Sequence, residues 1–162
     1  MIVLDGSVLV GVNGTRHALA ALLWTLEHEQ GEPPVAVTAW QSVHDSNGHA
    51  HENRGDARRA QSRTVDGAAR LLPGATAPER RLVEGLPGPA LVHASSSAAL
   101  LVLGGGRQWQ PGASGLGATT AYCLTHSLCP VLVVPALEYL LLASHDQWLD
   151  LADDPMPVPL PV

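Results

Sequence analysis

Several residue types are missing or scarce in this chain of 162 residues. It contains no Phe and no Lys, so all nine basic residues are Arg. A phosphate-binding loop of the Walker type needs a Lys, and that class of site is therefore excluded. The two cysteines, Cys123 and Cys129, are too few for a disulfide scaffold at this length, and they form no Cys-x-x-Cys motif.

The chain also lacks long apolar runs and a basic stripe. Its apolar runs, such as residues 98–103, are far too short to span a membrane. The N-terminus has neither the positive start nor the apolar run of a signal peptide, so we expect a cytoplasmic protein without a membrane partner. The net charge is −6 and the Arg residues are scattered, which disfavours nucleic acid as a partner.

Short apolar runs alternate with helical patterns along the chain. Runs that do not alternate in polarity are typical of strands buried on both faces, and they predict strands at residues 7–12, 35–40, 99–103 and 130–135, with a weaker strand at 80–84. Helices are predicted from Thr15 to about residue 30, at 56–72, from Pro87 onward, and at 117–127. Residues 41–55 are polar and predict a loop.

This alternation predicts an α/β domain with parallel strands and right-handed crossovers. Ligands of such open sheets bind beyond the carboxyl ends of the strands, where the winding direction reverses. The loops after the first and fourth strands, which start at Asn13 and Gly104, are therefore the candidate ligand-binding loops.

Five stretches of the chain, taken together, resemble the universal stress protein family. They are VLVGVNGT (8–15), VTAW (37–40), VEGLP (83–87), LVLG (101–104) and CPVLVV (129–134). The resemblance implies a flavodoxin-like, doubly wound, five-stranded parallel sheet with helices on both faces, within residues 1–135. It also implies a homodimer that pairs through the last strand, around Val131 to Val134.

Some members of that family bind ATP through a pattern of Gly, two residues, Gly, nine residues, Gly, and Ser or Thr. Gly104 and Gly117 keep their places here, but Arg107 and Ala118 replace the second Gly and the hydroxyl residue. Asn13 replaces the usual Asp after the first strand. Arg107 adds a cation with five donors that can hold a phosphate directly, and the helix N-terminus after Gly117 offers free N–H groups.

The resemblance therefore implies a nucleotide site, with ATP and Mg²⁺ as the expected ligands. Thr119 and Thr120 offer hydroxyl groups nearby. The expected binding residues are Val12, Asn13, Ala39, Gly104, Arg107, Gly117, Ala118, Thr119 and Thr120.

Two functions stay open at this point. One is nucleotide-responsive stress signalling with no or very slow hydrolysis. The other is a dimeric interaction scaffold that binds no nucleotide, because the glycine pattern is altered. We expect no enzyme, since no catalytic residues are apparent.

Two further regions draw attention. His44, Asp45, His49, His51 and Glu52 cluster within 41–55, and we interpret them as part of a solvated loop and expect no metal site. Residues 136–162 lie beyond the resemblance, and we expect this C-terminal extension to pack on the domain or on the dimer partner.

Overall fold

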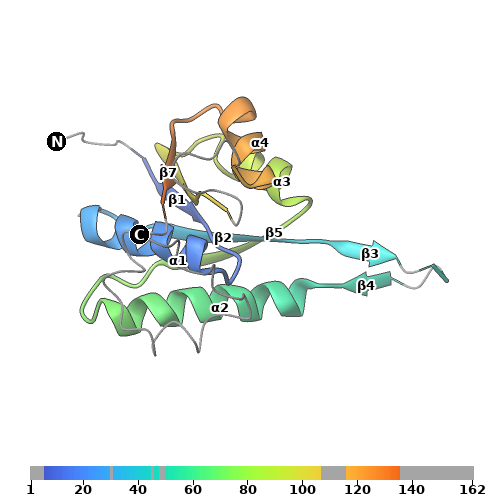
Figure 1. Ribbon diagram of the computed structural model, residues 1–162, viewed down its shortest axis with the longest axis horizontal. Coiled ribbons are helices and arrows are strands. Elements are labelled where there is room, and N and C mark those ends of the chain that lie inside the picture. Colours follow the sequence, from blue (N-terminus) through green and yellow to red (C-terminus); the bar gives the residue numbers. More distant parts are fainter. Residues whose placement is uncertain (1–5, 30, 45, 48–49, 107–115, 136–162) are drawn as a thin grey trace, which may run out of the picture.

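The computed structural model of the chain describes residues 6–29, 31–44, 46–47, 50–106 and 116–135. The predicted extension 136–162 lies outside these residues. In chain order the elements are β1 (Val8–Gly11), α1 (Arg16–His28), β2 (Val35–Trp40), β3 (Ser42–His44), β4 (Ala50–Glu52), α2 (Arg54–Leu71), β5 (Glu79–Glu84), α3 (Pro87–Ala94), β6 (Leu100–Gly104), α4 (Ala118–His126) and β7 (Val131–Val134). Figure 1 shows their arrangement.

Five of the strands form one parallel sheet, in the order β5-β2-β1-β6-β7. The register sets Val10 of β1 beside Ala36 of β2 and beside Val102 of β6. The predicted α/β class, with its doubly wound five-stranded parallel sheet, is confirmed. Flavodoxin itself orders its strands 2-1-3-4-5, whereas the five strands here run 3-2-1-4-5 in chain order. The winding therefore reverses between β1 and β6.

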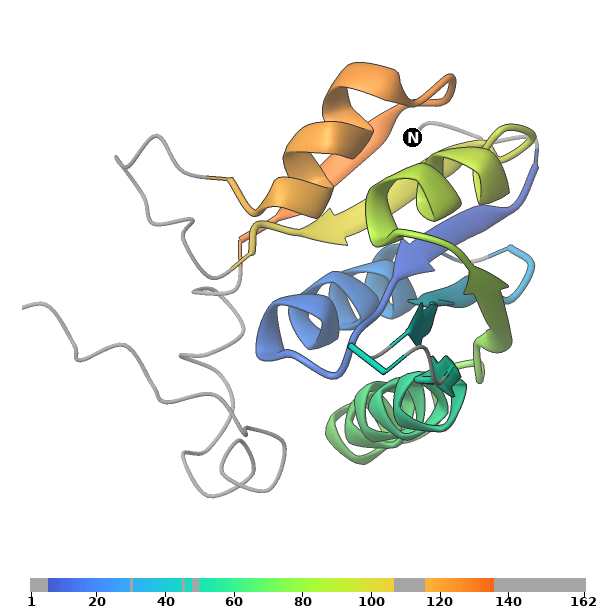
Figure 2. The same cartoon turned by 90° about the vertical axis from the view of Figure 1, so that its right-hand side faces the viewer.

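Helices cover both faces of this sheet. Figure 2 shows α1 and α2 on one face and α3 and α4 on the other. Val10 and Val102 point into the core under α1 and α2, whereas Leu9 and Leu101 belong to the core under α3 and α4. Burial on both faces explains why β1 and β6 are continuous apolar runs in the sequence.

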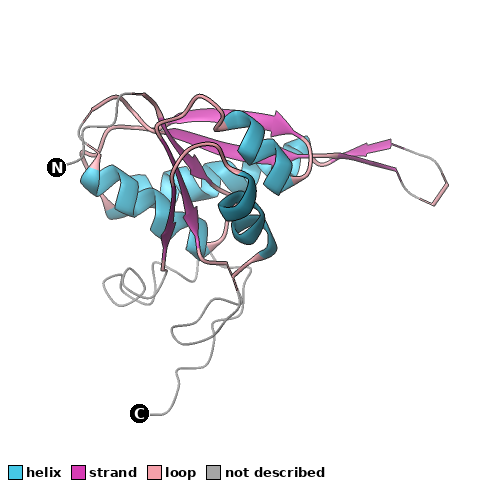
Figure 3. Ribbon diagram, turned by 90° about the horizontal axis from the view of Figure 1, so that it is seen from above, coloured by secondary structure: helices cyan, strands magenta, loops and turns pink. Residues whose placement is uncertain are grey.

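The prediction of a loop over residues 41–55 is wrong. β3 and β4 pair as an antiparallel hairpin, in which Val43 lies opposite His51, and this hairpin projects from the body of the domain (Figure 3). Its base is closed by Gln41, whose N–H donates to the Asn53 Oδ1 (2.7 Å), while the Asn53 N–H donates to the Gln41 carbonyl (3.1 Å). The sequence of this stretch is polar and shows no apolar periodicity, so it gave no signal for strands.

A buried glutamine joins α2 to the sheet. The Gln61 Nε2 group contacts the Ala36 carbonyl (3.0 Å), the Thr38 hydroxyl (3.2 Å) and the Arg81 carbonyl (2.9 Å). These acceptors belong to β2 and β5, so the amide holds the end of β2 in place under α2. Because the N–H groups of this buried amide all have acceptors, the glutamine makes the packing of α2 on the sheet more specific.

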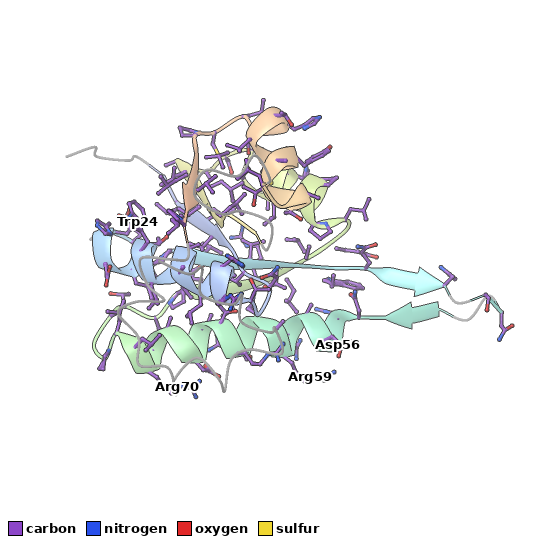
Figure 4. The ribbon with its side chains drawn as sticks, in the orientation of Figure 1. Trp24, Asp56, Arg59 and Arg70 are labelled. Atoms are coloured by element: carbon purple, nitrogen blue, oxygen red, sulfur yellow. The ribbon has the colours of Figure 1, made fainter. Side chains whose placement is uncertain are left out.

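The solvent side of α2 is charged. Asp56, Arg59 and Arg70 lie along it (Figure 4), and Asp56 forms an exposed ion pair with Arg59. Across the described part of the chain, no helix is long and apolar enough to cross a membrane.

Candidate functional site

A cleft of about 240 Å³ opens beyond the carboxyl ends of β1, β2 and β6. It therefore lies where the winding direction reverses, which is the position expected for ligands of open α/β sheets. Its lining residues come from all three strand ends and from the first turns of α1, α3 and α4. They are Gly11, Val12, Asn13, Thr15, His17, Ala18, Val37, Thr38, Ala39, Pro87, Leu91, Leu103, Gly104, Gly106, Gly117, Ala118, Thr119 and Thr120.

Gly104 allows α1 to approach the end of β6 closely. A Cβ atom at this position would lie 2.4 Å from the backbone oxygen of His17 and 2.8 Å from its Cβ. Real Cβ atoms essentially never come that close to a backbone atom, so only glycine fits without a shift of the helix. The sequence pattern singled out Gly104, and its structural role is this close contact between helix and strand.

The two ends of the 107–115 segment meet at the cleft. The Gly117 N–H donates to the Gly105 carbonyl (3.1 Å), and a Cβ on Gly106 would lie 2.7 Å from the Gly117 Cα. Gly106 has a φ of +83°, a conformation that glycine adopts without steric cost. The positive φ thus occurs at Gly106, one residue before the pattern position at Arg107, which lies outside the described residues.

The N-terminus of α4 has unsatisfied amide groups at the cleft. Its N-cap residue Gly117 makes no side-chain cap, and among the described residues the N–H groups of Ala118 and Thr119 have no hydrogen-bond partner. By contrast, the Thr15 hydroxyl caps α1 by accepting from the Ala18 N–H (3.3 Å), and α3 starts with Pro87, which has no N–H. The first turn of α4 is therefore the part of the cleft best suited to an anion.

The hydroxyl groups of this turn are not equivalent. The Thr120 Oγ1 donates to the Gly104 carbonyl at 2.8 Å, so its proton stabilises the loop and is not directed at a ligand. Thr119 lines the cleft and is half-buried. Ala118, where the family pattern has a hydroxyl residue, is exposed and supplies only its backbone N–H.

Hydrogen bonds fix the turn after β1. The Asn13 Oδ1 accepts from the Thr15 N–H (3.3 Å) and from the Thr15 hydroxyl (2.7 Å), which leaves the Asn13 amide N–H groups as donors for a ligand. The Val12 N–H donates to the Val37 carbonyl (2.9 Å), and the Thr38 hydroxyl donates to the Val12 carbonyl (2.7 Å). This side of the cleft is consequently preorganised.

The opposite part of the cleft is apolar. Val12, Val37, Ala39, Leu91 and Leu103 line it, and an apolar wall next to a few polar groups is typical of small-molecule sites. Trp40, at the end of β2, is not among the lining residues; the Arg54 guanidinium lies over its ring, 5.5 Å from the centroid.

Eight of the nine expected binding residues line this cleft. The ninth, Arg107, lies outside the described residues. Sequence reasoning missed the lining residues Thr15, His17, Thr38 and Leu91. His17 is buried and lies in the first turn of α1. The Thr15 N-cap locates that turn in the sequence, but the approach of His17 to Gly104 depends on packing between distant segments.

Comparisons with known proteins agree with the fold. A sequence profile of the universal stress protein family matches residues 6–135, which is most of the chain. Among curated proteins no significant match is found. A solved structure of a universal stress protein family member from Burkholderia pseudomallei is 25% identical and has a TM-score of 0.61, covering 83% of this chain and 99% of that one.

Two further solved structures contain nucleotides. A universal stress protein in complex with cAMP is 24% identical, with a TM-score of 0.55, and covers 81% of this chain and 97% of that one. A universal stress protein family member from Arabidopsis thaliana with AMP bound is 18% identical, with a TM-score of 0.52, and covers 81% of this chain and 91% of that one. At these identities the likeness shows the fold alone.

Proposed function

This chain belongs to the universal stress protein family, and on that premise we propose that it is a cytoplasmic, dimeric stress-signalling module that binds an adenine nucleotide, with no or very slow hydrolysis. One observation carries the proposal. The cleft combines unsatisfied amides at the start of α4 with an apolar wall at the ends of β1 and β2. A nucleotide has the matching halves, an anionic phosphate and an apolar base. The structural neighbours crystallised with cAMP and AMP support this choice of ligand.

The geometry suggests how the nucleotide would lie. Its phosphates would accept from the N–H groups of Ala118 and Thr119, where the helix dipole favours negative charge. Its base would lie against Val37 and Ala39. No carboxylate is among the described lining residues, so Mg²⁺ would be held by the phosphates and by water, as it commonly is.

Very slow hydrolysis fits the same set of residues. General-base activation of a water needs a group with a suitable pKa within hydrogen-bond reach of it. His17 is the one residue of the described lining with an ionisable side chain near neutral pH, and it is buried against the Gly104 backbone. The cleft therefore supports binding better than turnover.

Dimerisation through β7 is the second part of the proposal. β7 is an edge strand of the sheet, and Val131, Leu132 and Val133 are only half-buried. Leu124 and Leu128 are exposed nearby in the chain. An apolar edge strand offers unpaired backbone groups to a second copy. Pairing at β7 would therefore cover these backbone groups and the apolar side chains beside them.

Isothermal titration with ATP and Mg²⁺ tests the proposal. We expect saturable heat, and we expect Ala118→Ser to tighten binding by about fivefold, because one added hydrogen bond contributes about 1 kcal/mol. Ala121→Ser is the matched control, since Ala121 is exposed on the same helix outside the cleft, and its affinity should equal that of the unchanged protein. The absence of heat at millimolar nucleotide would refute nucleotide binding.

The alternative is a dimeric scaffold without a nucleotide. The missing hydroxyl at Ala118 and the engagement of the Thr120 hydroxyl by Gly104 favour it. Nucleotide analysis of freshly purified protein separates the two, because a co-purified nucleotide contradicts the scaffold. A dimer without heat or bound nucleotide supports it.

A further inference from the structure

At the cleft, β2 continues beyond the end of β1. β1 ends at Gly11, which lies opposite Val37, whereas β2 runs on and stays paired with β5 to its last residue. The last backbone hydrogen bond between β1 and β2 runs from the Val12 N–H to the Val37 carbonyl (2.9 Å). The side of β2 that faces β1 is therefore open at Thr38 and Ala39, and both residues line the cleft.

One amide on this open side lacks its partner in the ladder. The backbone groups of successive strand residues point to opposite sides of the strand. The Val37 carbonyl faces β1, where it accepts from Val12, and the Trp40 carbonyl faces β5, where it accepts from the Gly85 N–H (2.8 Å). Ala39 consequently faces β1, and in a regular parallel ladder its N–H would donate to the Val12 carbonyl. Within the described part of the chain this bond is not formed.

The Thr38 hydroxyl occupies the Val12 carbonyl instead. Thr38 is 4% exposed, and its Oγ1 donates to that carbonyl at 2.7 Å. The same oxygen accepts from the Gln61 Nε2 (3.2 Å), so the hydroxyl proton is directed away from the glutamine and toward Val12. Gln61 is itself 3% exposed, and the Ala36 and Arg81 carbonyls hold its amide in place. The three groups form a directional chain of hydrogen bonds, in which each bond strengthens the next.

We propose that Gln61 and Thr38 are positioning residues that keep the β2 side of the cleft open. Because the Thr38 hydroxyl engages the Val12 carbonyl, the ladder between β1 and β2 does not close by one more hydrogen bond. The Ala39 N–H is then left as a donor for a ligand. Gln61 does not line the cleft and acts through Thr38. The effect on a ligand rests on the proposed function, whereas the state of the Ala39 amide does not.

The turn after β1 is a competing cause of the same geometry. Gly14 has a φ of +81°, and its N–H donates to the Thr64 hydroxyl (3.1 Å). If this turn alone sets the path of the chain, loss of the Thr38 hydroxyl leaves the Ala39 amide free. If Thr38 sets it, the Val12 carbonyl regains the Ala39 N–H as its donor, because a carbonyl without a partner is costly. Hydrogen exchange at Ala39 therefore separates the two causes.

Amide hydrogen exchange of the full-length chain without a ligand, followed by NMR, tests the proposal. In the unchanged protein we expect the Ala39 amide to exchange roughly a hundredfold faster than the Val37 amide, which lies in the paired part of the strand. Thr38→Val keeps the shape of the side chain but lacks the hydroxyl, and it should slow exchange at Ala39 roughly tenfold. Thr38→Ser keeps the hydroxyl and should leave this exchange fast.

Thr25→Val is the matched control. Thr25 is also buried, at 1% exposed, and its hydroxyl donates to the Ala21 carbonyl within α1 (2.8 Å). Its replacement should leave exchange at Ala39 unchanged. An Ala39 amide that is as protected as Val37 in the unchanged chain already has a partner, and the proposal is then wrong whether or not the variants fold. Fast exchange at Ala39 in Thr38→Val would also overturn it, because the turn then sets the path.

Isothermal titration with ATP and Mg²⁺ tests the consequence for binding. Thr38→Val should weaken binding about fivefold, the usual worth of one net hydrogen bond, because the new bond between Ala39 and Val12 must break before the ligand enters. Thr38→Ser should bind like the unchanged chain, and so should Thr25→Val. Unchanged affinity in Thr38→Val, despite a slowed Ala39 amide, would refute the positioning role.

A double-mutant cycle tests the part played by the glutamine. Gln61→Met should also weaken ATP binding, and it should add nothing when it is combined with Thr38→Val. Additive losses of affinity would show that Gln61 does not act through Thr38, which contradicts its part of the proposal. If the unchanged chain binds no nucleotide but the Ala39 amide exchanges as expected in all variants, the proposed function is wrong, while the control of this amide by Thr38 is supported.

Discussion

Gly104→Ala is the sharpest test of how the cleft is built. The added Cβ would stand 2.4 Å from the His17 carbonyl oxygen, about 1 Å short of the 3.4 Å at which ordinary contact begins. The obstacle is backbone, so no side-chain rotation relieves it, and α1 must move away from β6. Overpacking of this kind costs about 3 kcal/mol, which corresponds to a fall in melting temperature of roughly 6–12 °C for a chain of this size.

Gly55→Ala is the matched control for that substitution. Gly55 lies in α2, and the nearest atom to an added Cβ is the end of the flexible Arg59 side chain, at 3.7 Å. Alanine restricts the unfolded chain and favours the helix, so this variant should gain about 0.5 kcal/mol. Thermal unfolding followed by circular dichroism measures both changes. A Gly104→Ala protein that melts within 2 °C of the unchanged chain would refute the close contact as the reason for this glycine.

Three more outcomes are expected. Thr120→Val should lower the free energy of unfolding by about 1–2 kcal/mol, measured with urea, because it removes the hydrogen bond to the Gly104 carbonyl. Thr120→Ser keeps the hydroxyl and should retain most of that stability. Equal losses of stability in the two variants would contradict this role of the hydroxyl. Arg59→Ala should lower the free energy of unfolding, measured with urea, by no more than about 0.5 kcal/mol, since both partners of its ion pair are more than 70% exposed; a larger loss would show that the pair is not merely a surface contact. Burial, and secondarily the nearby Cys129, raises the pKa of Cys123 to about 11. Its thiol should therefore resist alkylation at pH 8, and because the unfolded thiol ionises near pH 9, stability should fall as the pH rises from about 9 to about 11; a Cys123→Ala variant with the same decline would contradict this assignment.

The local sequence pattern was sufficient to predict most of the helices and strands. The runs at residues 35–40 and 99–103 are continuous and apolar because the corresponding strands, Val35–Trp40 and Leu100–Gly104, have helices on both faces. The predicted helix at 56–72 is found at Arg54–Leu71. The hairpin within residues 41–55 was not predicted because its polar sequence shows no apolar periodicity.

The sequence by itself also determined which loops form the candidate site. Alternating strands and helices force parallel strands, and parallel strands bring the loops after β1 and β6 to one edge. The spacing of Gly104 and Gly117 then identified two residues that the structure places in the cleft.

Only the tertiary structure decided the rest. The strand order depends on which strands pair, and no local pattern records that choice. The placement of His17 against Gly104 and the use of the Thr120 hydroxyl by the Gly104 carbonyl join residues 87 and 16 positions apart in the chain. Such contacts depend on how α1, β6 and α4 pack together, because packing brings together atoms whose proximity is not encoded by neighbouring residues.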